Sequence, residues 1–156
     1  MKEIYSVSVS SPSNIFRKWV LGAGIFNIVA AFPLATPFLY KPYYSVFNYL
    51  NHALGLGGMD LEPPVEGINK LLVNTAGLAL MLVGLILVYA STNLKEWIGI
   101  PFLNAIVRLV FSALLVYYLV TENISRILLS LAGIEVLIAG VFLYYIFKPE
   151  KLRLKD

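Results

Sequence analysis

The sequence contains no cysteine and only one histidine. The missing cysteine excludes disulfide bonds, thiolate catalysis, iron–sulfur ligation and zinc sites of the cysteine type. The single histidine, His52, cannot supply both axial ligands of a bis-histidine haem. No serine is accompanied by a recognisable histidine–acid pair, so a serine nucleophile is not supported. We therefore expect no cofactor that is bound covalently or through a sequence motif.

Charged residues are also scarce. They make up 13% of the 156 residues, whereas 59% are hydrophobic, and soluble domains carry about 25% charged residues. Too few positions are suited to water to cover a soluble globule of this size. The net charge of +3 does not indicate nucleic acid, because the basic residues cluster beside apolar stretches without an interleaved aromatic patch. The composition indicates an integral membrane protein whose main partner is the lipid bilayer.

Four apolar stretches are long enough to cross a hydrocarbon layer of about 30 Å. They predict an all-α fold, a four-transmembrane-helix up-down bundle in a single membrane domain covering residues 1–156. The predicted spans lie at about residues 17–40, 68–91, 98–120 and 124–147.

The connection between the first two spans has a helical pattern of its own. Pro42 suits a first helical position, Gly55 suits the position after a helix, and apolar residues repeat between them at helical spacing. We predict a short amphipathic helix at about residues 42–54, lying in the membrane interface and roofing one side of the bundle.

The basic residues predict the orientation. With the N-terminus in the cytoplasm, eight of them fall on the inner side and three on the outer side. Both termini of this multi-pass protein of the cell membrane are therefore expected to be cytoplasmic. The inner set is Lys2, Arg17, Lys18, Lys95, Lys148, Lys151, Arg153 and Lys155, and the outer set is Lys41, Lys70 and Arg126.

The first two predicted spans each carry a face of small residues with one amide. Such faces let helix backbones approach closely, and a buried amide finds a partner there. We expect both faces to pack inside the bundle. They consist of Ala23, Asn27, Ala30 and Ala31 in the first span, and of Asn74, Gly77, Met81 and Gly84 in the second.

The last two spans carry opposite charges at matching depth. Arg108 and Glu135 each lie roughly 15 Å from the start of their stretch, near the middle of a membrane. Arginine does not lose its proton, so it needs a partner, and a bidentate pair with Glu135 would fix the register of the two helices. Asn104 and Ser112 lie four residues on either side of Arg108, which makes one face of that helix polar.

These polar residues permit three interpretations. The Arg108–Glu135 pair could be a structural clasp, a ligand-binding site or a proton path through Glu135. The predicted ligand-binding residues are Arg108, Glu135, Asn27, Asn74, Asn104 and Ser112.

His52 offers a further, weaker candidate site. Asp60, Glu62 and Glu66 follow it in the same connection. A metal site there is conceivable, but no ligand spacing is recognisable and a solvated polar face is favoured. We therefore predict no metal site.

The layout resembles the DoxX-like family of small four-helix membrane proteins. The shared features are Gly22-Ala-Gly-Ile-Phe-Asn27 in a first span with a proline-rich exit, a longer first outer loop, a polar Ser91-Thr-Asn93 turn and a basic residue, Arg108, in the third span. The likeness covers most of residues 17–147. It implies quinone-linked electron transfer or an accessory role in a membrane complex, since the group includes the membrane subunit of thiosulfate:quinone oxidoreductase. It transfers no catalytic residue.

The favoured function is an accessory or binding subunit with a buried polar site for a lipid-like or quinone-like molecule or a partner helix. The alternatives are the membrane subunit of a quinone-linked, DoxD-like oxidoreductase and a small proton-coupled transporter using Glu135. A catalytic role is disfavoured, because the chain has no cofactor ligands of its own and would need a redox partner. Further membrane subunits or a second copy of the chain are the expected protein partners.

Overall fold

The computed structural model describes residues 13–148. They form five helices: α1 (Asn14–Ala35), α2 (Tyr40–Ala53), α3 (Gly67–Thr92), α4 (Gly99–Thr121) and α5 (Leu128–Phe147). Every helix except α2 is long and apolar enough to cross a membrane. The predicted all-helical class and the four long apolar helices are confirmed.

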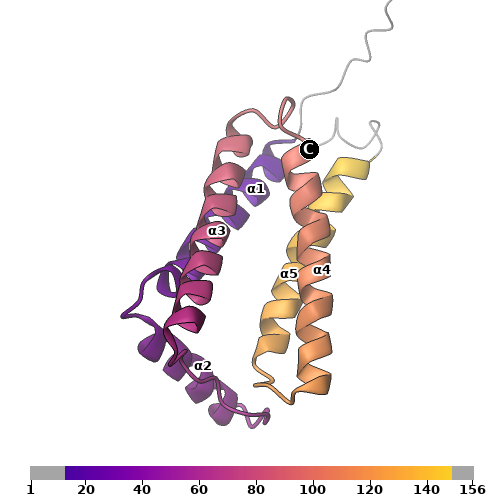
Figure 1. The fold of residues 1–156 in the computed structure, drawn as a ribbon. Helices are drawn as coiled ribbons and strands as arrows, with labels where there is room; N and C mark the ends of the chain where they lie inside the picture. Colours follow the sequence, from indigo (N-terminus) through magenta and orange to yellow (C-terminus); the bar gives the residue numbers. More distant parts are fainter. Residues whose placement is uncertain (1–12, 149–156) are drawn as a thin grey trace, which may run out of the picture.

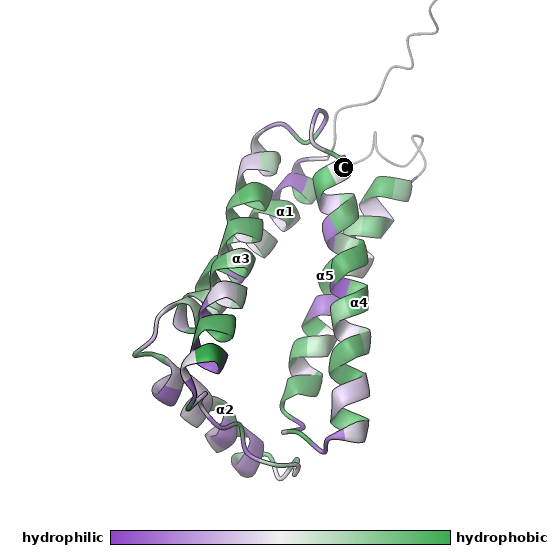
Figure 2. Cartoon of the chain, in the orientation of Figure 1, coloured by the Kyte–Doolittle hydropathy of each residue, from purple (hydrophilic) through white to green (hydrophobic). Residues whose placement is uncertain are grey.

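The outward faces of the four long helices are apolar, as the hydropathy colours of Figure 2 show. Large hydrophobic side chains lie open on all of them, up to Val120, which is 79% exposed. A soluble monomer rarely leaves so much apolar surface uncovered. These faces fit a lipid environment, and the chain is a small membrane protein.

The first helix begins and ends earlier than the predicted span at 17–40. It begins at Asn14 because the Ser13 hydroxyl accepts a hydrogen bond of 3.2 Å from the backbone N–H of Phe16 and so caps the helix. It ends at Ala35 because Thr36 precedes Pro37, and a residue before proline avoids helical backbone angles. The first span is therefore shorter at its C-terminal end than predicted.

The last helix begins at Leu128, later than the predicted span at 124–147. The preceding residues pair instead with the loop between α2 and α3: the Met59 N–H donates to the Asn123 carbonyl over 2.8 Å, and the Arg126 N–H donates to the Gly57 carbonyl over 3.1 Å. A Cβ atom on Gly58 would lie 2.4 Å from the carbonyl oxygen of Ile124. Residues 54–66 are thus docked on the turn at 122–127, and we call this contact the loop cap.

A buried amide completes the loop cap. Asn51 of α2 is 1% exposed. Its nitrogen donates to the Gly57 carbonyl over 3.0 Å, and its oxygen accepts from the Ile127 N–H over 3.0 Å. One side chain therefore joins α2, the loop and the start of α5. This role of Asn51 was not predicted, because Asn51 lies on neither a small-residue face nor a predicted span.

Glycines set the contact between α1 and α3. A Cβ atom on Gly84 would lie 2.7 Å from the Gly24 carbonyl oxygen, and one on Gly77 would lie 2.4 Å from the Ala35 nitrogen. Side chains at these positions would push the two backbones apart. Gly77 and Gly84 are packing residues, as predicted. The residue of α1 that meets Gly84 is Gly24, one position from the predicted face.

The helices form two pairs, α1 with α3 and α4 with α5, and the members of each pair lie side by side in Figure 1. At one end the pairs meet through the Phe16 ring, which packs edge-on to Phe142 at 6.0 Å and stacks on Tyr145 at 5.4 Å. At the other end they meet through α2 and the loop cap. The polar residues predicted from the sequence lie between these two junctions.

The glycine contact predicts a selective loss of stability. Gly77→Ala should lower the free energy of unfolding by about 1–3 kcal/mol, because the new methyl group overlaps the α1 backbone. Gly140→Ala is the matched control, since nothing lies within 4 Å of a Cβ atom there. Unfolding in mixed detergent micelles measures both variants. Equal stability of the two would contradict the close contact.

Candidate functional site

Arg108 lies between the two helix pairs and is only 4% exposed. Its Nε donates to Asn104 Oδ1 on the same helix over 2.7 Å, and its Nη2 donates to Asn27 Oδ1 on α1 over 2.7 Å. Its Nη1 contacts Glu135 Oε2 on α5. The guanidinium therefore has acceptors on three helices.

The spacing of four residues along α4 produces this arrangement. Residues four apart lie above one another on a helix, which places Asn104 and Ser112 on the face of Arg108. The Ser112 hydroxyl donates to the Arg108 carbonyl over 2.9 Å and lies 3.3 Å from the Ala132 carbonyl of α5. Ser112 thus supports the contact between α4 and α5 but does not contact the guanidinium.

The ion pair differs from the predicted one in its geometry. Glu135 is 7% exposed, and it meets Arg108 through one nitrogen–oxygen contact rather than the two of a bidentate pair. The second carboxylate oxygen, Oε1, has no hydrogen-bond donor among residues 13–148. One acceptor of the pair therefore stays available.

Asn74 does not join this group. Its nitrogen donates to the Ala35 carbonyl over 3.0 Å, and its oxygen accepts from the Tyr40 hydroxyl. The amide fastens α3 to the junction of α1 and α2, one helical turn from Gly77. The structure thus brings together five of the six predicted residues and gives Asn74 a separate, structural set of partners.

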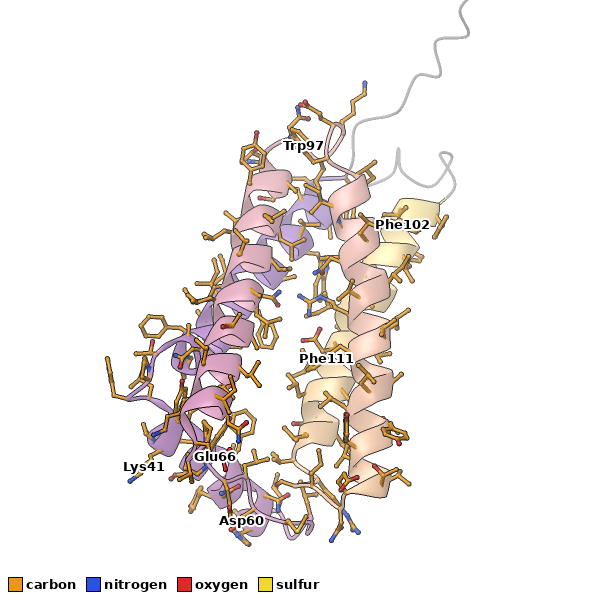
Figure 3. All side chains as sticks on the ribbon, in the orientation of Figure 1. Lys41, Asp60, Glu66, Trp97, Phe102 and Phe111 are labelled. Atoms are coloured by element: carbon orange, nitrogen blue, oxygen red, sulfur yellow. The ribbon has the colours of Figure 1, made fainter. Side chains whose placement is uncertain are left out.

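A cavity of about 220 Å³ lies against the polar group. Four of its lining residues are polar members of that group, and the rest, apart from the Tyr43 hydroxyl, are apolar. Figure 3 shows Phe111 on the side of α4 that faces α3. The lining consists of Asn27, Asn104, Arg108, Glu135, Phe26, Ala30, Ala31, Leu34, Tyr43, Leu80, Val83, Val107, Phe111 and Leu131.

Hydrogen-bond donors outnumber acceptors beside the cavity. Arg108 uses three of its five N–H groups, and the two asparagines accept through their oxygens, which leaves both NH₂ groups without a partner in residues 13–148. The only buried polar side-chain atom without a partner in those residues is Ser125 Oγ. The free NH₂ group of the buried Asn27 must therefore reach open space.

Tyr43 is a lining residue that the site prediction missed. It reaches the cavity from α2, and its hydroxyl donates to the Ala30 carbonyl over 3.0 Å. Burial, and then the neighbouring Tyr44, raise the pKa of Tyr43 above 10.0, so the hydroxyl remains a donor. The sequence feature that could have identified Tyr43 is its position in the apolar repeat of the predicted helix at 42–54.

His52 lies outside the cavity lining and makes a local contact. Its Nε2 is 2.9 Å from Asp60 Oδ1, and both side chains are exposed. In residues 13–148 no group of three or more His, Asp or Glu side chains is placed to hold a metal ion. At this position the described residues form a solvent-exposed polar contact.

Comparisons with protein-family models, curated proteins and solved structures find no match for the chain. The function must therefore be argued from the geometry of the site.

The ion pair predicts a characteristic pattern of stability. Glu135→Leu should cost about 3–5 kcal/mol, because it leaves a buried arginine without its counter-charge. The double variant Arg108→Met/Glu135→Leu should recover most of that loss, since no buried charge remains. Unfolding in detergent gives the comparison, and Lys95→Met is the exposed-charge control. A double variant as unstable as the single one would show that the pair itself holds the bundle together.

Proposed function

We propose that this protein is an accessory or binding subunit of the membrane that takes a lipid-like or quinone-like molecule into the cavity beside Arg108. The observation that carries the proposal is the unpartnered NH₂ groups of Asn27 and Asn104 next to a guanidinium with spare N–H groups. If the Arg108–Glu135 pair only held the bundle together, these hydrogen-bond donors would be expected to have protein partners, because buried polar groups are normally hydrogen-bonded.

The charges favour a neutral oxygen acceptor. Arg108 and Glu135 cancel each other, and the free carboxylate oxygen of Glu135 would repel an anion entering the cavity. A carbonyl oxygen of a quinone or of a lipid ester accepts hydrogen bonds without adding charge. In this arrangement Asn27, Asn104 and Arg108 donate to the ligand, and Glu135 holds Arg108 in place.

Access from the lipid also supports the proposal. The cavity is smaller than the roughly 300–1,000 Å³ of a pocket for a whole ligand. Val107, which lines it from α4, is 63% exposed, and Leu80 lines it from α3 and is also exposed. The polar end of a ligand would occupy the cavity while its tail leaves between α3 and α4.

The same proposal includes the orientation in the membrane. Val46 and Leu50 lie on the apolar side of α2 and are exposed, as is Leu54 directly after the helix, which suits a helix in the membrane interface. The basic residues favour cytoplasmic termini. The α2 end of the bundle would then be the outer end.

The other two functions use the same residues. A DoxD-like subunit would present the quinone carbonyl to these donors and receive electrons from a partner protein. A proton-coupled transporter would load a proton on the free oxygen of Glu135. Unchanged proton flux in proteoliposomes carrying Glu135→Gln would exclude the transporter.

Ligand-dependent stabilisation tests the proposed site. We expect a short-chain benzoquinone or a short-chain phosphatidylcholine, added to purified protein in detergent, to raise the unfolding temperature with concentration. Comparing the two probes separates a quinone from a lipid ester. Val83→Phe should abolish the rise by filling the cavity.

Leu82→Phe is the matched control, because Leu82 is exposed on the same helix and does not line the cavity. It should respond to the probes as the parent protein does. If neither probe stabilises the parent, or if both variants lose the response equally, the binding proposal fails.

A further inference from the structure

A second hollow lies between α1 and α5, nearer the start of α1. It is a groove of about 460 Å³ and shares only Phe26 with the cavity beside Arg108. Lys18 provides the only charge in its lining. The lining residues are Ile15, Lys18, Trp19, Gly22, Ala23, Phe26, Ile134, Leu137 and Ile138.

Gly22 keeps this groove open. Nothing lies within 4 Å of a Cβ atom built on it, whereas Gly24, two residues later, is pressed against α3. The groove extends from Lys18 to Phe26, which is about 12 Å along α1. An apolar groove of this length on a lipid-facing surface suits a flexible hydrocarbon chain.

Lys18 places a positive charge at one end of the groove. No acidic side chain of residues 13–148 pairs with it, and the adjacent Arg17 is also exposed and unpaired within those residues. Trp19 lies beside it, and tryptophan prefers the headgroup level of a bilayer. Basic pockets between membrane helices attract anionic headgroups.

We propose that this groove binds an anionic phospholipid, with its phosphate at Lys18 and one acyl chain lying along Gly22. A second copy of the chain is a poorer occupant. A two-fold contact through the same patch would bring Arg17 and Lys18 of the two copies towards each other. A phosphate instead complements these charges. The lipid site does not depend on the proposed ligand of Arg108.

Fluorescence quenching tests this site directly. The chain has two tryptophans, so a Trp97→Phe parent reports on Trp19 alone. The parent is reconstituted in phosphatidylcholine vesicles containing either brominated phosphatidylglycerol or brominated phosphatidylcholine. We expect the anionic lipid to be enriched about fivefold beside Trp19, and so to quench more strongly at equal content.

Two variants in the Trp97→Phe parent separate the headgroup from the chain. Lys18→Gln should reduce quenching by the anionic lipid to the level of the neutral one. Gly22→Leu should weaken quenching by both lipids, because its side chain fills the groove. Lys95→Gln and Gly140→Leu are the controls and should match the parent, since neither residue lines the groove and Gly140 also faces open space.

Three results would overturn the proposal. The first is equal quenching of the parent by the two brominated lipids. The second is an equal effect of Gly22→Leu and Gly140→Leu. The third is conversion of a dimer to a monomer by Gly22→Leu, measured by light scattering, with the lipid preference unchanged; this would make a second copy the occupant.

Discussion

An arginine inside a membrane protein cannot escape its charge by losing a proton, so the surrounding helices must supply acceptors. Arg108 finds them in Asn27 on α1, Asn104 on α4 and Glu135 on α5. Because these groups come from different helices, satisfying one side chain also fixes how the helices are rotated. The guanidinium is therefore the polar connection between the α1–α3 pair and the α4–α5 pair.

The cavity follows from the way those pairs are joined. Aromatic rings hold them at one end, and α2 with the loop cap holds them at the other. Between the two ends, Arg108 spans the distance with a long side chain instead of close backbone contact. Asn27 and Asn104 can accept hydrogen bonds from the guanidinium only through their oxygens, so their NH₂ groups point away from it. A polar, donor-rich cavity is the consequence of placing amides around an arginine.

Short-range patterns predicted much of this arrangement. Apolar length identified the four long helices, matching depth paired Arg108 with Glu135, and the spacing of four placed Asn104 and Ser112 on one face. Asn27 and Asn74 could not be distinguished in the same way, because both lie on small-residue faces and only the position of Tyr40 decides between them. The late start of α5 also depends on pairing with a loop some 65 residues earlier.

The glycines extend this contrast between local pattern and position in space. Gly24, Gly77 and Gly84 are needed because another backbone occupies the space of a side chain, whereas Gly22 and Gly140 face open space. The sequence does not distinguish glycines that contact another backbone from glycines that face open space, and Gly22 and Gly24 lie only two residues apart on the same helix. Their surroundings differ because α3 packs against Gly24, whereas Gly22 faces the lipid side. A glycine on the lipid side is not required by the packing of a neighbouring helix. What the glycine at position 22 produces instead is the groove beside Lys18, which is why we propose a ligand there.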